Sequence, residues 1–162
     1  MNILKWTVIV IAALVVLLVL AGQFGLLKGS RPADLGVREG KLKRPSLTPN
    51  CVTSQADLWA DHPQQAYARI AALPLRGDGP ATVARIKALV EQMPGAVVVE
   101  SRADYVYAQF TTPLLKFVDD VEFWLDPAAG VVQVRSASRI GHGDRGLNRT
   151  RIEALRARLQ AG

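Results

Sequence analysis

The residues whose types could do chemistry gather in one part of the sequence, between Phe117 and Arg151. Three acids, Asp119, Asp120 and Glu122, fall within one predicted strand, and five arginines follow them in the same stretch. A buried carboxylate needs a partner, and a guanidinium group offers a planar, bidentate fork to a phosphate or a carboxylate. The stretch therefore predicts either a charged binding site or a network of internal ion pairs.

The candidate binding residues extend from this strand into the next strand, the turn after it and the start of the last predicted helix. They are Asp119, Asp120, Glu122, Arg135, Ser136, Ser138, Arg139, Asp144, Asn148, Arg149 and Arg151. Gathered in one place, they would form a polar site that recognises an anionic ligand, a lipid headgroup or a partner protein. The same residues would equally form a buried salt-bridge network that organises the fold and binds no ligand. Both interpretations agree with the sequence.

An enzyme is the alternative to a binding module, and Cys51 is its candidate reactive thiol. Nucleophilic catalysis would pair Cys51 or a serine with a base, and His62 and His142 are the only histidines in the chain. The pattern G-x-S-x-G is absent. A hydrolase or transferase would have to use Cys51 or a buried carboxylate, and no residue receives a catalytic role. We expect a binding module rather than an enzyme.

The acids do not form a convincing metal site. Side chains of consecutive strand residues point to opposite faces, so Asp119 cannot easily share an ion with Asp120 and Glu122. The two histidines and the single cysteine lie far apart, without the spacing of zinc ligands. The sequence therefore predicts no metal and no cofactor.

An apolar segment near the N-terminus predicts a membrane anchor. Residues 6–27 lie between Lys5 and Lys28 and carry no charged side chain. At about 1.5 Å per residue, a helix of this length crosses the hydrocarbon core of a bilayer. A cleaved signal peptide is the alternative, although Lys5 is the only charged side chain before the segment. We expect a single-pass membrane protein that contacts the lipid bilayer through residues 6–27.

Two signals in the sequence disagree about which side of the membrane carries the rest of the chain. The basic residues that follow the segment favour a cytoplasmic domain, whereas a very short N-terminal tail before a signal-like segment favours export. A lone cysteine cannot form an internal disulfide, so Cys51 does not report the redox compartment.

The net charge of +6 is concentrated near the anchor. Residues 1–44 hold seven Lys and Arg against two acids, so the rest of the chain is almost neutral. This placement suits anionic lipid headgroups, and no aromatic and basic pattern of a nucleic-acid-binding sheet is present. Residues 28–49 mix Gly, Pro, Ser and charges without apolar periodicity, which predicts a flexible tether. The expected organisation is an anchor over 1–27, a basic tether over 28–49 and a single domain over 50–162.

The domain is expected to be α+β, with a mainly antiparallel sheet of four to five strands packed by two helices. Gly77-Asp78-Gly79-Pro80 marks a helix start, apolar residues recur at helical spacing after it, and Pro94-Gly95 closes the helix. A second helix is predicted over 148–160. Alternating apolar residues predict the strands, and the short links between them imply an antiparallel meander. The strands are Ala96–Glu100, Tyr105–Thr111, Phe117–Leu125 and Val131–Ser138, with an earlier extended segment over Tyr67–Leu75.

The last two strands can be paired from the sequence alone. A four-residue loop, Pro127–Gly130, places the apolar residues of both strands on one face. The same register sets Glu122 opposite Arg135 on the other face. Asp119 then points to the apolar face, beside Ser136 or Ser138, where an ionised carboxylate needs partners.

Several motifs resemble those of the family called domain of unknown function 1499 (DUF1499). They are FVDDVEF, RSASR and NRTRIEALR within the block that begins at Phe117, with NCVTSQA at Asn50–Ala56, Pro74-Leu75 and Gly77-Asp78 before it. The resemblance covers nearly all of the chain from Asn50 onward. Thr53 departs from it, because the family more often has serine there. The family has no established activity, so the resemblance implies a single domain and a choice of residues but no function.

Overall fold

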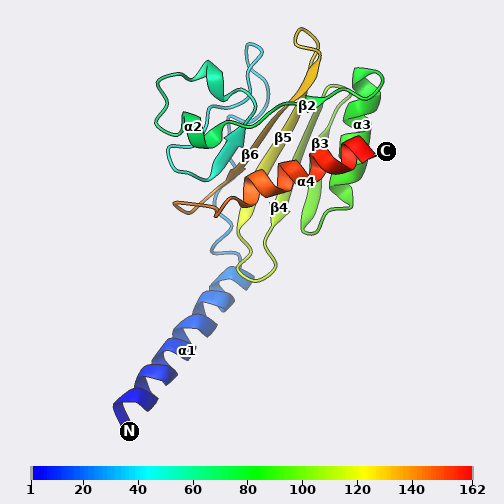
Figure 1. The fold of residues 1–162 in the computed structure, drawn as a ribbon. Helices are drawn as coiled ribbons and strands as arrows, with labels where there is room; N and C mark the ends of the chain where they lie inside the picture. The colour runs from blue at the N-terminus through cyan, green and yellow to red at the C-terminus, as the bar shows by residue number, and fades with distance from the viewer. Residues whose placement is uncertain (1, 162) are drawn as a thin grey trace.

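The computed structural model describes residues 2–161, which form an N-terminal helix and an α+β domain (Figure 1). The sheet has the strand order β1 (Cys51–Thr53), β6 (Val131–Ser138), β5 (Val118–Asp126), β4 (Tyr105–Thr111) and β3 (Ala96–Ser101). A short sixth strand, β2 (Leu73–Pro74), also pairs with β6. Every pairing between these strands is antiparallel. The expected fold class is confirmed.

Two helices of the α+β domain pack on one face of the sheet. They are α3 (Gly79–Glu91) and α4 (Leu147–Ala161). The helix α3 begins where the sequence predicts, because the Asp78 side chain caps it by accepting a hydrogen bond from the Ala81 N–H at 2.6 Å. A 3-10 turn, η1 (Ala56–Leu58), and a single helical turn, α2 (Gln65–Ala68), follow β1. The extended segment predicted from Tyr67 is wrong at its start, since the Ala68 and Arg69 N–H groups close helical hydrogen bonds to Gln64 and Gln65.

The two faces of the sheet differ in character. The face under α3 and α4, here called the inner face, carries the apolar core, which includes Val121, Phe123, Val134, Ile152 and Leu155. The opposite, outer face is polar and aromatic. Its buried side chains are Tyr105, Tyr107, Asp120, Glu122 and Arg135.

Residues 31–44 lie across the outer face, although the sequence predicted a flexible tether here. We call this segment the strap. The Gly36 N–H donates to Glu122 Oε1 at 2.6 Å, and the Leu42 N–H donates to Gln55 Oε1 at 2.8 Å. Leu42 is buried with the two tyrosines of the outer face. The two hydrogen bonds satisfy buried carbonyl and carboxylate oxygens beneath the strap, which would otherwise need water as a donor.

The strap reverses direction in a tight turn between Arg38 and Lys41, which pair with each other through backbone hydrogen bonds. Glu39 and Gly40 both have positive φ, 51° and 72°, as the central residues of a type I′ turn do. The turn lies close to Trp124, near the end of β5.

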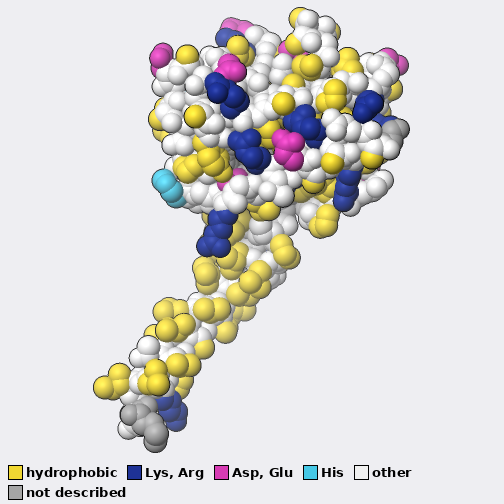
Figure 2. All heavy atoms as spheres, in the orientation of Figure 1, with side chains coloured by type: hydrophobic (Ala, Val, Ile, Leu, Met, Phe, Trp, Pro, Cys, Tyr) yellow, Lys and Arg dark blue, Asp and Glu magenta, His cyan; other side chains and the backbone are white. Residues whose placement is uncertain are grey.

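The N-terminal helix α1 (Asn2–Gln23) is 22 residues long and apolar enough to cross a membrane. A signal sequence near an N-terminus has the same length and apolar composition, so these two properties fit both an anchor and a signal sequence. Its hydrophobic side chains are exposed along its length (Figure 2). Its C-terminal end touches the loop between β4 and β5, where Gln23 Nε2 donates to the Leu114 carbonyl at 2.9 Å. Gly22 is buried there, and a Cβ on it would lie 2.6 Å from the Leu115 oxygen. The domain is therefore held close to the end of the helix.

Candidate functional site

The sequence-predicted site residues form two clusters on opposite faces of the sheet. The strand β5 alternates its side chains, so Asp119 pairs across the inner face and Asp120 and Glu122 across the outer face. Glu122 lies opposite Arg135 and Asp119 lies opposite Ser138, in the register that the sequence predicts. A single polar centre does not form.

Asp119 and Arg151 are the charged pair of the inner cluster. Arg151 Nη2 donates to Asp119 Oδ2 at 2.6 Å, and the two side chains are 9% and 3% exposed. Arg151 Nη1 donates to Asn148 Oδ1 at 2.7 Å and to Ser136 Oγ at 3.2 Å. The guanidinium plane also rests on the Phe110 ring, with 4.5 Å to its centroid. The pair is enclosed and hydrogen-bonded from several elements.

Asn148 and Asp144 tie the start of α4 to the sheet. Asn148 Nδ2 donates to the Asn50 carbonyl, to Ser138 Oγ and to Asp144 Oδ2. Tyr67 Oη donates to Asp144 Oδ1 at 2.5 Å. Burial disfavours the Asp144 carboxylate, but the hydrogen bonds from Tyr67 and from the chain around Asn148 outweigh it and lower its pKa. Burial, with the hydrogen bond to Asp144, raises the pKa of Tyr67 to about 12. These groups satisfy one another.

Asp120 and Arg139 form the first pair of the outer cluster. Arg139 donates to both carboxylate oxygens, from Nε at 2.9 Å and from Nη2 at 2.8 Å. Tyr107 Oη donates to the same carboxylate at 2.5 Å, and Arg31 of the strap lies over the Tyr107 ring. Burial raises the pKa of Tyr107, and the hydrogen bonds with Asp120 raise that of Arg139. This is a closed bidentate ion pair.

Glu122 and Arg135 form the second outer pair, and it is less complete. Arg135 Nη1 lies 3.6 Å from Glu122 Oε2, and the side chains are 3% and 0% exposed. Glu122 Oε1 accepts hydrogen bonds from Tyr105 Oη and from the Gly36 N–H. Glu122 Oε2, Arg135 Nε and Arg135 Nη1 have no hydrogen-bond partner within residues 2–161. Burial raises the pKa of Glu122 even though Arg135 opposes the rise.

Arg149 and Cys51 belong to neither cluster. Arg149 donates to the backbone carbonyls of Arg69 and Tyr67, so it fastens α4 to the segment before β2. Cys51 lies in the strand β1 and is 1% exposed. Among residues 2–161, no group of three or more His, Cys, Asp or Glu side chains is placed to hold a metal ion.

The burial of Cys51 gives a first testable prediction. In the folded protein the Cys51 thiol should react with a thiol reagent such as DTNB far more slowly than in denaturant, because the reagent cannot reach the sulfur. The measurement is the absorbance rise on DTNB addition, with and without guanidinium chloride. Equally fast labelling of the folded chain would restore the reactive-thiol hypothesis.

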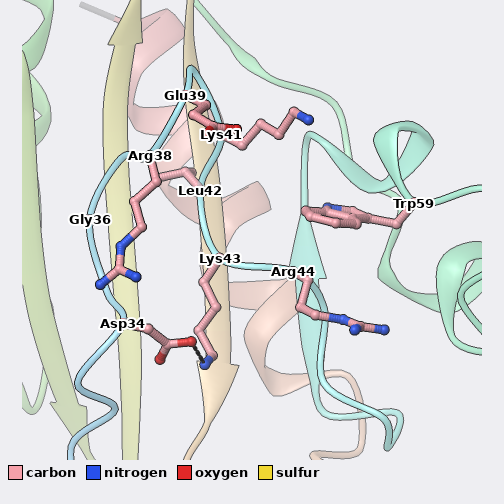
Figure 3. A pocket seen from close by; sticks show the side chains of 9 residues that line it. All are labelled: Asp34, Gly36, Arg38, Glu39, Lys41, Leu42, Lys43, Arg44 and Trp59. Carbon is pink, nitrogen blue, oxygen red and sulfur yellow. Dashed lines mark hydrogen bonds and ion pairs between the residues drawn. The ribbon is translucent and has the colours of Figure 1, made fainter.

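A basic pocket of about 250 Å³ lies on the strap (Figure 3). Its lining residues are Asp34, Gly36, Arg38, Glu39, Lys41, Leu42, Lys43, Arg44 and Trp59. Lys43 is paired with Asp34, and this hydrogen bond lowers the pKa of Asp34. Within residues 2–161, Arg38, Lys41 and Arg44 have no carboxylate within ion-pair distance.

Trp59 contacts two of the cations of this pocket. Lys41 Nζ and Arg44 Cζ each lie 5.9 Å from the centre of its ring, above and below it in Figure 3. The pocket lies over the Glu122–Arg135 pair, because the strap residue Gly36 both lines the pocket and binds Glu122. These cations fall within the stretch predicted to be a tether, and the run of basic residues at 38–44 is the signal that could have identified the pocket.

Comparison with known proteins places the chain in a family. The sequence profile of a family described as "Protein of unknown function (DUF1499)" matches residues 41–159. No curated protein and no solved structure matches the chain. The matched range contains the paired acids and arginines of both polar clusters, five of the nine residues that line the basic pocket, all of α3 and most of α4. The chain therefore belongs to the DUF1499 family.

Proposed function

We propose that the protein is a membrane-anchored binding module for an anionic small molecule, and that the ligand binds in the basic pocket on the strap. The observation that carries this proposal is the set of three exposed cations, Arg38, Lys41 and Arg44, that line the pocket without acidic partners. Two of them, Lys41 and Arg44, lie over the Trp59 ring. An anion placed among them gains charge-assisted hydrogen bonds, which are about twice as strong as neutral ones. The indole ring adds an apolar surface for the rest of the ligand.

The two buried clusters favour a structural role under this proposal. Asp119, Asp120 and Arg139 already have ionic partners within hydrogen-bond distance, so a ligand would first have to break these bonds. The clusters instead hold the surfaces around the pocket. Glu122 fixes the strap through Gly36, and Gln55 holds both Gly40 and Leu42.

The position of the pocket favours a soluble ligand over a headgroup of the anchoring bilayer. The end of α1 touches Leu114, just before β5 begins, whereas Gly40 of the turn lies near Trp124, close to the end of β5. A strand rises about 3.3 Å per residue, so the length of β5 separates the two ends by roughly 20 Å. Figure 1 shows the strap turn at the end of the domain remote from α1. Arg38 and Lys41, expected beside the membrane surface as part of the basic tether, thus lie away from the end of α1.

The proposal is tested by titrating the full chain, in an uncharged detergent, with pyrophosphate and with citrate. The variant R38A/K41A should bind both anions at least about tenfold more weakly, because a hydrogen bond to a charged group contributes roughly 1.5–3 kcal/mol. Isothermal titration calorimetry measures the affinities. Binding should also weaken as salt is raised.

The variant R85A/R158A is the matched control. It removes the same charge from α3 and α4, where neither arginine has an ion-pair partner within residues 2–161. It should bind like the natural chain. Equal weakening in both variants would mean that only net charge matters, and absence of binding by the natural chain would refute the proposed function.

A further inference from the structure

A second pocket of about 230 Å³ adjoins the basic pocket and shares Arg44 and Trp59 with it. Its other lining residues are Leu58, Ala60, Asp61 and His62. His62 is 7% exposed, and its backbone N–H donates to the Trp59 carbonyl at 2.9 Å. The backbones of Trp59 and His62 are therefore linked beside this pocket.

The hydrogen bonds of His62 assign its tautomer. The Gln64 backbone N–H donates to His62 Nδ1 at 3.2 Å, so Nδ1 acts as the acceptor. A neutral imidazole with an accepting Nδ1 carries its proton on Nε2. Nε2 is buried and has no partner within residues 2–161. His62 thus holds a buried N–H donor that lacks an acceptor.

Trp59 holds a second donor of the same kind. Its Nε1–H can only donate, and the atom is buried without a hydrogen-bond partner in the described chain. A buried donor without an acceptor costs free energy, so most such groups in folded proteins have a partner. Two unsatisfied donors in residues that line one pocket, next to Arg44, call for a group that only accepts hydrogen bonds.

We propose that the ligand carries an oxyanion group, a phosphate or a carboxylate, that accepts hydrogen bonds from Trp59 Nε1 and His62 Nε2 while Arg44 neutralises its charge. This inference rests on the proposed function, because it names the chemical group that the same site recognises. The two nitrogens have no contact with solvent, so an exposed side chain at the mouth, such as Arg44, shifts when the oxyanion enters. The neighbouring basic pocket, which Arg38 and Lys41 line, then holds the rest of the molecule.

The direct test is the indole N–H resonance of Trp59 in ¹⁵N-labelled full chain, identified by its loss in W59F. Saturating pyrophosphate should move this resonance, because the N–H gains a charged acceptor, whereas that of Trp6 in α1 should stay in place. Citrate serves as the carboxylate arm. A shift with both anions identifies oxyanions in general as the ligand class, and a shift with pyrophosphate alone narrows it to phosphate.

Two substitutions remove the donors singly. W59F keeps an aromatic ring without the N–H, and H62N keeps an oxygen acceptor for the Gln64 N–H but loses Nε2. Each should weaken pyrophosphate binding by about tenfold, the effect of one hydrogen bond to a charged group. Circular dichroism checks that each variant is folded. If a variant does not fold, the shift of the Trp59 indole N–H resonance in the natural chain is the test of the inference.

The outcomes separate this inference from the proposed function. If R38A/K41A loses pyrophosphate binding while W59F and H62N bind normally and the Trp59 resonance does not move, the oxyanion inference is overturned and the basic pocket stands. If the natural chain binds neither anion, both are overturned.

Discussion

Replacing Asp119 by alanine should lower the free energy of unfolding by roughly 3–5 kcal/mol, the usual cost of breaking one partner of a buried ion pair. The substitution leaves the Arg151 guanidinium, 9% exposed, without its carboxylate. The remaining acceptors, Asn148 Oδ1 and Ser136 Oγ, are neutral. An arginine cannot escape the cost by losing its proton. Urea denaturation of the full chain in an uncharged detergent, followed by circular dichroism, measures the loss.

The control for this prediction is Glu153 on the same helix as Arg151. Its carboxylate pairs with Arg156 at 2.8 Å, but its side chain is 48% exposed. An exposed pair of this kind contributes about 0.2–1 kcal/mol, so E153A should change little. The variant D119N keeps acceptor oxygen without charge and should fall between the two. Similar losses for D119A and E153A would contradict the view that Asp119 holds α4 on the sheet.

Most of the fold could be predicted from the sequence because the central strands and long helices have clear periodicity. The strand Tyr105–Thr111 alternates apolar and polar residues and appears with the predicted bounds. The pairing of Glu122 with Arg135 followed from two independent signals, the apolar alternation and the charge match. The edge strands β1 and β2 are three and two residues long, too short to give a periodic signal.

The strap could not be predicted in the same way. Its hydrogen bonds to the rest of the domain use backbone groups, the N–H of Gly36 and of Leu42 and the carbonyl of Gly40, and Leu42 adds a buried side chain. Every residue except proline has such an N–H, so the composition of 28–49 gave no sign of where it would lie. A stretch rich in Gly and Pro is also what a flexible linker contains. The basic pocket depends on the strap, so its residues were missed together with it.

The polar residues singled out in the sequence lie in two separate clusters, and this arrangement could not be predicted. Alternation along β5 already indicated that Asp119 would not share an ion with Asp120 and Glu122, and the structure has them on opposite faces. The partner of each acid depends on which later element crosses that face. Arg151 reaches Asp119 from α4, whereas Arg139 reaches Asp120 from just beyond the end of β6. The distances between these elements in the fold are not encoded in the local pattern.

The Glu122–Arg135 pair gives the second large prediction. The variant R135M should lower the free energy of unfolding at pH 7 by about 3–5 kcal/mol, because it leaves a fully buried carboxylate without a cation. The double variant E122Q/R135M should recover at least half of that loss. Glutamine keeps a carbonyl oxygen for Tyr105 and for the Gly36 N–H, and the double variant holds no buried charge at this position.

The dependence on pH distinguishes this explanation from a simple packing defect. Burial already raises the pKa of Glu122 above the ordinary value of 4.5, and removal of Arg135 takes away the opposing charge. A carboxyl whose pKa is raised by folding favours the folded state at low pH, and that contribution is lost as the pH rises through the raised pKa. The deficit of R135M should therefore shrink as the pH is lowered from 7 toward about 4.5, while that of D119A should not shrink by this mechanism, because Arg151 stays charged. A deficit of R135M that is the same at both pH values would mean that lost packing, and not an uncompensated carboxylate, accounts for it.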